Sequence, residues 1–424
     1  MKDCNPFTSH AITPSRMKLL RRIVVVDEDR CVGCGFCESV SVCKSVGECV
    51  GCLACYYACP HEARVVRVEE VECRLLDIYV DGVRYRIPSR LTVMEALKRI
   101  GVSFAPPGSR GLTAPCRLGG CWACAVIIDG ELERTCITPV RDGMRISLEV
   151  EKATPLRIVH GPQPHRVGGK ATPWWEVDGL GYVESAIWVA GCNLRCPQCQ
   201  NYHVTYDNSS RPMTPVEAAR KLTECGMIYG TRGLAISGGE PTLNRRWLVE
   251  FFRELRRLNP EARLHLDSNG TILSKDYVDE LVEAGCNNIG IEPKAGRLET
   301  YMRITGLNDR EEAERFFENS WRILEYVASN YSGKVYVGAG FAYNPEWMSL
   351  EEVAEIGDRV ASIDPKLQVT VLDYFPAFRR RRLRRPTPRE MLEVKKVLEE
   401  RGLKTVIVQT SIGHIGPGDR MIRY

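Results

Sequence analysis

Fifteen of the nineteen cysteines in this 424-residue chain fall into three short clusters, and this grouping constrains the fold more than any other feature. The clusters span residues 31–59, 116–136 and 192–199. In a chain without an apolar signal segment, closely spaced thiols are typical of metal ligands rather than of disulfides. The spacing therefore predicts three separate metal-binding modules.

Charge and hydropathy narrow the class of protein. Fifty-eight Lys and Arg side chains are balanced by 54 Asp and Glu, and the net charge of +4 weighs against nucleic acid as a partner. No apolar run approaches the ~18 residues that a membrane-spanning helix needs. We therefore expect a cytoplasmic protein of ordinary globular composition that does not associate with membranes.

Changes in residue pattern divide the chain into five segments. Residues 76–80 and 83–87 alternate apolar and polar side chains around an Asp-Gly turn, which predicts a hairpin. Thr92 and Glu95 predict a capping box at the start of the next helix. A hairpin, a helix and then a cysteine-rich loop are typical of a β-grasp domain.

The predicted segments are an irregular N-terminus (1–22), a small cluster-cored module (23–72), a β-grasp domain (73–150), a Pro- and Gly-rich linker (151–181) and a large C-terminal domain (182–424).

The C-terminal domain is predicted to be α/β, because short apolar strands alternate with longer helical patterns and such repeats need a parallel sheet. Six strands are fewer than the eight of a closed barrel. We therefore expect a partial (β/α)6 TIM-like barrel with its chemistry at the carboxyl ends of the strands. The predicted strands cover residues 184–190, 233–237, 263–267, 288–292, 335–339 and 368–373.

The third cysteine cluster has the pattern CxxxCxxC, formed by Cys192, Cys196 and Cys199 directly after the first predicted barrel strand. Three thiolates can hold a four-iron cluster while one iron stays open to a small molecule. A zinc site with His203 as fourth ligand is the alternative, although structural zinc sites normally use other spacings. A Gly-Gly-Glu segment at 238–240 ends the second strand, so its bare backbone is expected beside the cysteine loop.

These motifs resemble those of the radical S-adenosylmethionine (SAM) enzymes, and within them the pyruvate formate-lyase activating enzyme branch and its uncharacterised relatives. The resemblance covers about residues 182–410. It implies that the three cysteines hold a [4Fe–4S] cluster whose open iron is chelated by SAM. It also implies that Gly238, Gly239 and Glu240 bind the methionine amino group.

Two further segments complete the SAM site that the resemblance implies. Asp267, Ser268 and Asn269 resemble the Asp-Thr-Asn-Gly of the branch, and Glu292 and Lys294 resemble its Asp-x-Lys. Paired acids and a lysine at adjacent strand ends could fix a zwitterionic ligand or a monovalent cation. No catalytic side chain is expected, because the cluster and SAM carry the radical chemistry.

The chain departs from the branch at two places. Gln198 precedes the third cysteine where an aromatic residue is usual, so the packing near the adenine must differ. The segment 375–378 reads Phe-Pro-Ala-Phe in place of Leu-Pro-Tyr-His. The arginine-rich run that follows, 379–385, has no interleaved aromatics, so a solvated loop is favoured over a grip on RNA or an acidic partner.

The first cysteine cluster contains two triplets with ferredoxin spacing. The second triplet continues to Cys59 and Pro60 as in bacterial ferredoxins, in which the fourth cysteine ligates the partner cluster. Two zinc sites are the alternative, but CxxCxxC triplets would overcrowd a tetrahedral ion. By resemblance to two-cluster ferredoxins, one [4Fe–4S] cluster would be held by Cys31, Cys34, Cys37 and Cys59 and the other by Cys43, Cys49, Cys52 and Cys55.

The second cysteine cluster begins with the spacing of plant-type [2Fe–2S] ferredoxins. Its short final interval resembles the iron–sulfur subunits of succinate dehydrogenase and of molybdenum hydroxylases. The expected ligands are Cys116, Cys121, Cys124 and Cys136. Of the other four cysteines, Cys225 and Cys286 are expected to be buried as small apolar side chains, whereas Cys4 and Cys73 stay unassigned.

The sequence thus predicts a radical SAM oxidoreductase fused to its own electron supply, with SAM, three [4Fe–4S] clusters and one [2Fe–2S] cluster as cofactors. It is expected to cleave SAM reductively to a 5′-deoxyadenosyl radical that abstracts hydrogen. The branch resemblance favours a glycyl residue of a partner protein as substrate and a low-potential protein as electron donor. The alternatives are a radical SAM enzyme that modifies a small molecule or RNA, and a non-catalytic electron-transfer protein.

Overall fold

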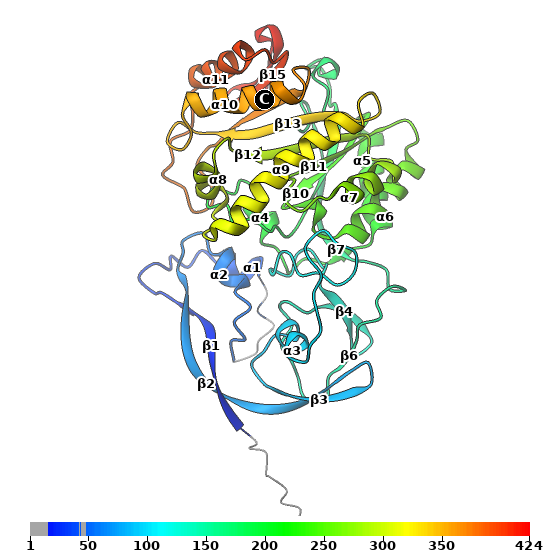
Figure 1. Ribbon diagram of the computed structural model, residues 1–424, viewed down its shortest axis with the longest axis vertical. Coiled ribbons are helices and arrows are strands. Elements are labelled where there is room, and N and C mark those ends of the chain that lie inside the picture. Colours follow the sequence, from blue (N-terminus) through cyan, green and yellow to red (C-terminus); the bar gives the residue numbers. More distant parts are fainter. Residues whose placement is uncertain (1–15, 42, 44–47) are drawn as a thin grey trace, which may run out of the picture.

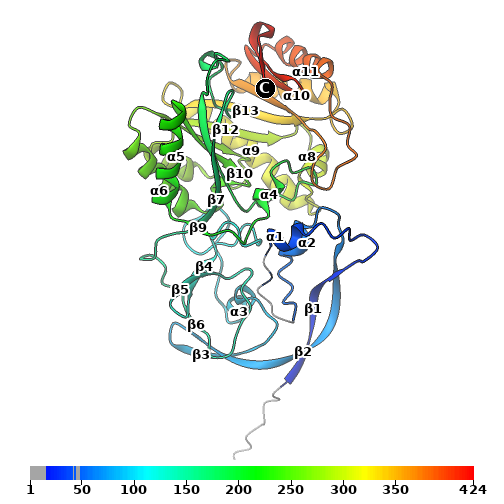
Figure 2. The ribbon, with the colours of Figure 1, turned by 180° about the vertical axis from the view of Figure 1, so that it is seen from behind.

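The structure, a computed structural model, describes residues 16–41, 43 and 48–424, so Cys4 lies outside the described part. Figure 1 shows a large α/β unit above a smaller unit built on curved strands, with two short helices between them. The same division is seen from behind in Figure 2. The cysteine-rich segments lie close to the junction of the two units.

A long two-stranded ribbon organises the N-terminal part. β1 (Arg16–Val26) pairs antiparallel with the first half of β2 (Arg64–Val80). Residues 16–22 were predicted to be irregular, and this was wrong. Opposite charges lie across the ribbon, with Arg16 3.3 Å from Glu72, and such cross-strand pairs favour the strand. The two short helices are α1 (Phe36–Ser39) and α2 (Ala54–Ala58).

β2 runs without a break into the β-grasp domain, where it forms the predicted hairpin with β3 (Val83–Pro88). The boundary expected between residues 72 and 73 therefore falls inside one strand. Thr92 and Glu95 form the predicted capping box of α3 (Val93–Arg99). The sheet order is β1-β2-β6-β4-β5, with β3 also on β2. The remaining strands are β4 (Ala125–Ile128), β5 (Glu131–Arg134) and β6 (Arg145–Ser147).

Seven parallel strands, one more than predicted, form the centre of the C-terminal unit in the described part of the chain. The additional strand is β15, a run rich in β-branched residues that follows the last helix and continues the same repeat. The parallel strands, in spatial order, are β8 (Glu184–Val189), β10 (Gly233–Gly238), β11 (Arg263–Ser268), β12 (Asn288–Lys294), β13 (Tyr336–Tyr343), β14 (Gln368–Asp373) and β15 (Thr405–Thr410).

Helices link these strands, and short antiparallel strands extend both edges of the sheet. The order of the sheet is linear from β17 to β9, so the barrel is open, as expected. The helices are α4 (Tyr202–Thr205), α5 (Pro215–Tyr229), α6 (Arg245–Leu258), α7 (Lys275–Glu283), α8 (Leu298–Thr305), α9 (Arg310–Asn330), α10 (Leu350–Ile363) and α11 (Pro388–Glu400). The edge strands are β9 (Pro212–Met213), β16 (Gly413–Ile415) and β17 (Met421–Arg423).

The segment 151–181, predicted to be a linker, belongs to the barrel instead. It contains β7 (Arg157–His165), which pairs antiparallel with β8. Residues 168–174, here called the barrel plug, then cross the amino ends of the parallel strands. Asn288 Nδ2 donates to the carbonyl of Ala171 (2.7 Å), and Gln368 Nε2 donates to the carbonyl of Lys170 (2.9 Å). A proline- and glycine-rich segment can therefore be held in place by side chains far away in the sequence.

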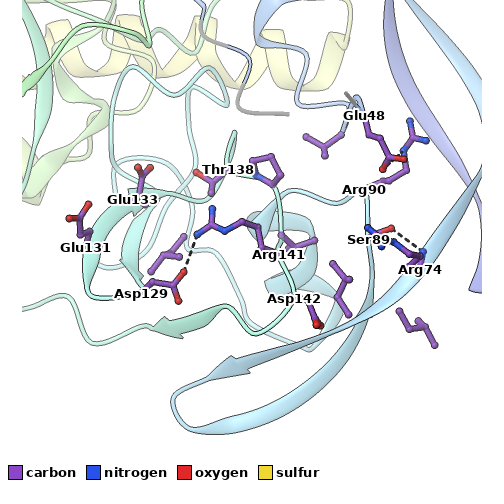
Figure 3. Close-up of a pocket in the computed structure, with 16 residues that line it drawn as sticks. Glu48, Arg74, Ser89, Arg90, Asp129, Glu131, Glu133, Thr138, Arg141 and Asp142 are labelled. Atoms are coloured by element: carbon purple, nitrogen blue, oxygen red, sulfur yellow. Dashed lines mark hydrogen bonds and ion pairs between the residues drawn. The ribbon is translucent and has the colours of Figure 1, made fainter. Parts of the chain in front are cut away.

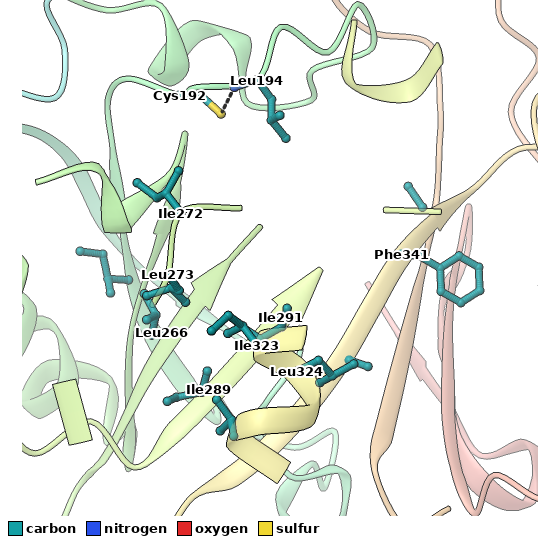
Figure 4. Packing of buried hydrophobic residues seen from close by; sticks show 14 of the residues in the cluster. Cys192, Leu194, Leu266, Ile272, Leu273, Ile289, Ile291, Ile323, Leu324 and Phe341 are labelled. Carbon is teal, nitrogen blue, oxygen red and sulfur yellow. Dashed lines mark hydrogen bonds between the residues drawn. The ribbon is translucent and has the colours of Figure 1, made fainter. Parts of the chain in front are cut away.

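One apolar core joins the sheet, the outer helices and the cysteine loop. In Figure 4, Ile289 and Ile291 of β12 lie beside Ile323 and Leu324 of α9. Cys192 belongs to the same buried cluster. The position of the cysteine loop is therefore fixed by the packing of the barrel.

The β-grasp domain and the barrel meet backbone against backbone at the end of β8. Gly191 has a φ of +84°, and a Cβ atom there would lie 2.9 Å from the amide nitrogen of Cys121. A Cβ on Gly120 would lie 2.7 Å from the Gly191 nitrogen. Asn244 Nδ2 also donates to the carbonyl of Cys121 (3.0 Å). These contacts argue against the independent folding that a linker would have implied.

Gly191→Ala should lower the free energy of unfolding by about 3 kcal/mol, because left-handed backbone strain adds to overpacking. The matched control is Gly230→Ala, which also has a positive φ (+65°) but has open space around the new methyl group. The control should lose only about 1–2 kcal/mol. Denaturant unfolding of both variants measures the difference, and equal losses would show that the interface tolerates an added carbon.

Candidate functional site

The three cysteines of the CxxxCxxC loop line one cavity of about 360 Å³ at the carboxyl ends of the barrel strands. Burial raises the pKa of Cys192 and Cys196 to about 12 and that of Cys199 to about 11. Buried thiols of this kind ionise when iron binds, with release of protons. Three sulfur donors around a common cavity fit a [4Fe–4S] cluster that keeps one iron open.

The Gly-Gly-Glu segment packs directly on the cysteine loop. Gly239 N donates to the carbonyl of Val189 (2.8 Å), and Glu240 N donates to the carbonyl of Gly191 (2.9 Å). A Cβ on Gly238 would collide with the backbone of Val189. Both glycines also line the cavity. Their first structural role is therefore to bring the ends of β8 and β10 together, which places the segment beside the cavity as predicted.

Glu240 joins the ends of β10 and β11. Its carboxylate accepts hydrogen bonds from Thr242, from Ser268 Oγ (2.8 Å) and from the backbone N–H of Asn269 (2.7 Å). Asn269 in turn donates to Asn193 Oδ1 in the cysteine loop (3.2 Å). Glu240, Ser268 and Asn269 therefore form one hydrogen-bonded group with Asn193 of the cysteine loop.

Asp267, Glu292 and Lys294 lie together, as the sequence predicted. Lys294 Nζ is 2.7 Å from Glu292 Oε1. Burial alone would disfavour these charges. Lys170 and His265 nevertheless lower the pKa of Asp267, while Glu292 raises that of Lys294. All three side chains are therefore ionised, Glu292 beside Lys294 and Asp267 beside Lys170 and His265.

Three further charged residues of this group were missed by sequence reasoning. Lys170 Nζ, from the barrel plug, is 3.1 Å from Glu292 Oε2. His265 is fully buried between Glu184 (2.9 Å) and Asp267 (3.1 Å). Although burial opposes it, these carboxylates raise the pKa of His265 to about 10. The alternation that places His265 and Asp267 on one face of β11 was a usable signal, but nothing local marked Lys170.

The four cysteines of the second cluster are fully buried together. Cys116 Sγ is in hydrogen-bonding contact with Cys121 and Cys136, and Cys124 is in contact with Cys136. This network lowers the pKa of Cys116 despite its burial. Four mutually adjacent thiols in a dry site fit a [2Fe–2S] cluster.

The eight cysteines of the first cluster separate into the two groups that the ferredoxin resemblance implies. Cys59 lines one small cavity together with the first triplet, Cys31, Cys34 and Cys37. Burial raises the pKa of Cys52 to about 11 and of Cys55 to about 12, and Cys43 and Cys49 act on both electrostatically. Cys59 follows the second triplet in the sequence but lies with the first triplet in space, as in two-cluster ferredoxins. The two sets of thiols therefore fit two [4Fe–4S] clusters.

A larger cavity, of about 920 Å³, lies between the β-grasp domain and the residues on either side of Cys49, Glu48 and Val50 (Figure 3). Its described lining contains arginines and carboxylates in ion pairs, such as Arg141 with Asp129 (3.0 Å), and no cysteine. Size alone therefore does not identify the functional site.

The remaining candidates occupy structural positions. Cys73, Cys225 and Cys286 are buried, and none of them lines the barrel cavity. The side chain of Gln198 is buried outside the cavity lining, without a hydrogen-bond partner. The prediction that the arginine run 379–385 is a solvated loop is partly wrong. The Arg379 guanidinium donates hydrogen bonds to the carbonyls of Tyr56, Tyr57 and Cys59 (3.1 Å for Cys59), at the carboxyl end of α2.

Residues 187–333 match the radical SAM superfamily, and residues 74–150 match a 2Fe-2S iron-sulfur cluster binding domain. The chain is 34% identical over 119 residues to a GTP 3′,8-cyclase homologue of Methanococcus aeolicus. That match covers 28% of this chain and 38% of the relative. A glycyl-radical activating-enzyme homologue of Methanocaldococcus jannaschii is 25% identical over 183 residues, which are 43% of this chain and 70% of the relative.

Among solved structures, SAM-bound SuiB of Streptococcus suis aligns with a TM-score of 0.40 and 15% identity over 52% of this chain and 48% of that one. Within residues 16–41, 43 and 48–424, no helix is both long enough and apolar enough to cross a membrane. The family matches fall on the barrel and on the β-grasp domain, where the buried cysteines were found. The chain therefore contains a radical SAM domain and a [2Fe–2S]-binding domain.

Proposed function

We propose that this protein is a radical SAM oxidoreductase that acts on an uncharged, hydrogen-bonding substrate, with a glycyl residue of a partner protein as the best fit. The observation that carries the proposal is the single cavity lined by the three loop cysteines, the Gly-Gly-Glu segment and the Asp267, Glu292 and Lys294 group. Cys192, Cys196 and Cys199 would hold the cluster, and the cluster with SAM would supply the chemistry when bound: one-electron reductive cleavage of SAM to methionine and a radical able to abstract hydrogen.

The charges around the cavity suit SAM. Four carboxylates line it, against Lys170, Lys294 and the protonated His265 that pairs with two of them, so carboxylates exceed these cations by one. Burial lowers the pKa of His165, and it lowers that of His414 to about 4, so both imidazoles are neutral at physiological pH. A lining with excess negative charge favours a cationic sulfonium ligand and disfavours a polyanion.

Polar atoms without partners indicate the substrate class. Thr370 Oγ1, Gln409 Oε1 and His414 Nδ1 are buried, make no hydrogen bond and belong to residues that line the same cavity. Buried polar groups of this kind are normally satisfied, here by a ligand that offers both donors and acceptors. A peptide amide does so without charge, which supports the glycyl substrate over a nucleoside triphosphate.

Cys196→Ala should abolish release of 5′-deoxyadenosine and lower the iron content by about four atoms per chain, because two thiols cannot hold the cluster. Cys225→Ala is the matched control, since that thiol is buried beside Ser185 and does not line the cavity. Chromatography of anaerobic reactions under strong chemical reduction measures the product. Activity of Cys196→Ala equal to that of the wild type would place the chemistry elsewhere.

GTP should not raise the rate of 5′-deoxyadenosine release above the rate with SAM alone, because its triphosphate would enter a cavity lined by excess carboxylate. A glycyl radical protein mixed with the enzyme, SAM and reductant should instead acquire a radical signal in electron paramagnetic resonance. A rate increase with GTP, together with transfer of deuterium from labelled GTP to 5′-deoxyadenosine, would favour the small-molecule alternative.

We also propose that the N-terminal clusters deliver the electron. Arg195 of the cysteine loop supports this route, because its guanidinium donates to the carbonyls of Cys192 (2.6 Å) and Cys116 (2.6 Å) and lies 4.6 Å from the ring of Tyr57 in α2. Cys52 packs against the buried group of Cys124 and Cys136. The three sets of cysteines therefore follow one another from the ferredoxin-like module to the barrel, and a low-potential protein donor would reduce the first of them.

Cys124→Ala should separate electron delivery from bond cleavage in the full-length protein. With dithionite the variant should keep most of its 5′-deoxyadenosine release, but with reduced flavodoxin it should lose at least about tenfold, because the [2Fe–2S] cluster needs four ligands. Cys73→Ala, a buried cysteine outside the cluster sets, is the control. Equal turnover of Cys124→Ala and wild type with flavodoxin would show that this cluster is not on the route.

A further inference from the structure

Two buried carboxylates of the barrel cavity share one cation that comes from the barrel plug. Lys170 Nζ is 3.1 Å from Glu292 Oε2 and 3.7 Å from Asp267 Oδ2, and all three side chains are at least 87% buried. Two carboxylates in such surroundings destabilise each other unless a positive charge lies between them. The structure supplies that charge from its own chain.

The path of the Lys170 side chain is made by glycines on the neighbouring strands. A Cβ on Gly340 of β13 would lie 2.6 Å from Lys170 Cδ, and a Cβ on Gly290 of β12 would lie 2.9 Å from Lys170 Cβ. A Cβ on Gly338 would collide with the Lys170 carbonyl oxygen. A larger residue at Gly340 would displace the lysine side chain, and one at Gly290 would also meet Asp267 Oδ1, so the barrel interior is shaped to admit this pair.

Hydrogen bonds also hold the backbone of the barrel plug at Lys170. Lys170 N donates to Asp267 Oδ1 (3.3 Å), and Gln368 Nε2 donates to the carbonyl of Lys170. Glu292 is held from its other side by Lys294, which itself lies near Cys196. Displacing Lys170 would therefore move the carboxylate that orients Lys294 at the edge of the cluster loop.

We propose that Lys170 is a built-in counter-cation that positions Asp267 and Glu292 for SAM, so that the site takes no monovalent cation from solution. This inference rests on the proposed binding of SAM in the same cavity. Lys170 is a positioning residue, because it acts through the two carboxylates. The other ionisable groups that face these three side chains include His265, Glu184, Lys294, His165, Tyr374 and the three loop cysteines, Cys192, Cys196 and Cys199.

The test compares Lys170→Met with the wild type, both loaded with clusters, in tetramethylammonium chloride and in potassium chloride of equal ionic strength. In tetramethylammonium the variant should bind SAM at least about tenfold more weakly, because its two acids lose their partner. Potassium should restore most of that affinity and should raise the melting temperature of the variant. The wild type should show neither response to potassium.

Two further variants make the outcome decisive. Lys152→Met removes an exposed lysine from the segment before β7 and should behave like the wild type. Gly340→Ala keeps the lysine but closes its path, so it should reproduce both potassium responses even where Lys170→Met folds poorly.

The proposal would be overturned if Lys170→Met bound SAM as tightly as the wild type in tetramethylammonium. It would also be overturned if a folded variant showed no change in SAM affinity or melting temperature when potassium is added. The melting temperatures are measured without SAM. A wild-type protein that fails to bind SAM would therefore contradict the proposed function, while the cation response of the variants would still test the role of Lys170.

Discussion

Close backbone contact at the end of β8 is the constraint on which the rest of the site depends. Gly191, Gly238 and Gly239 have no side chains, so the cysteine loop, the Gly-Gly-Glu segment and the [2Fe–2S] loop can all reach the same place. A methyl group at any of the three would push one partner away. The proposed SAM site and the [2Fe–2S] loop can therefore lie side by side because these positions have no Cβ atoms.

The buried carboxylates of the barrel cavity are balanced by cations in an interior that excludes water. Glu184, Asp267 and Glu292 are buried charges that would be expensive alone, and each has a cationic partner within about 3 Å. The lining nevertheless keeps an excess of carboxylate. That excess is complementary to the positive sulfonium and amino groups of SAM, so the ligand supplies part of the balance.

The sequence predicted well where chemistry is local. The cysteine spacings, the Gly-Gly-Glu segment and the capping box at Thr92 each depend on neighbours in the chain, and the structure places them where they were expected. The seventh strand, at 405–410, is rich in β-branched residues but lies outside the six predicted strands. The barrel plug had no readable pattern, because its proline- and glycine-rich composition is that of a linker and its partners, such as Gln368, lie nearly two hundred residues away. Hydrogen bonds between a side chain and a distant backbone group produce no repeating pattern in the sequence. The role of Lys170 could therefore not be predicted from the sequence.

β2 connects the ferredoxin-like module to the β-grasp domain without a loop. One uninterrupted strand of 17 residues serves both the ferredoxin-like module and the β-grasp domain, pairing with β1 at one end and with β3 and β6 at the other. The two modules therefore have no hinge between them along this strand and must tilt or shift as one body. Adding or deleting a single residue in β2 would turn every later side chain to the opposite face of the sheet. The strand thus fixes the separation of the ferredoxin-like module from the β-grasp domain, and the proposed electron route would need no domain movement along it.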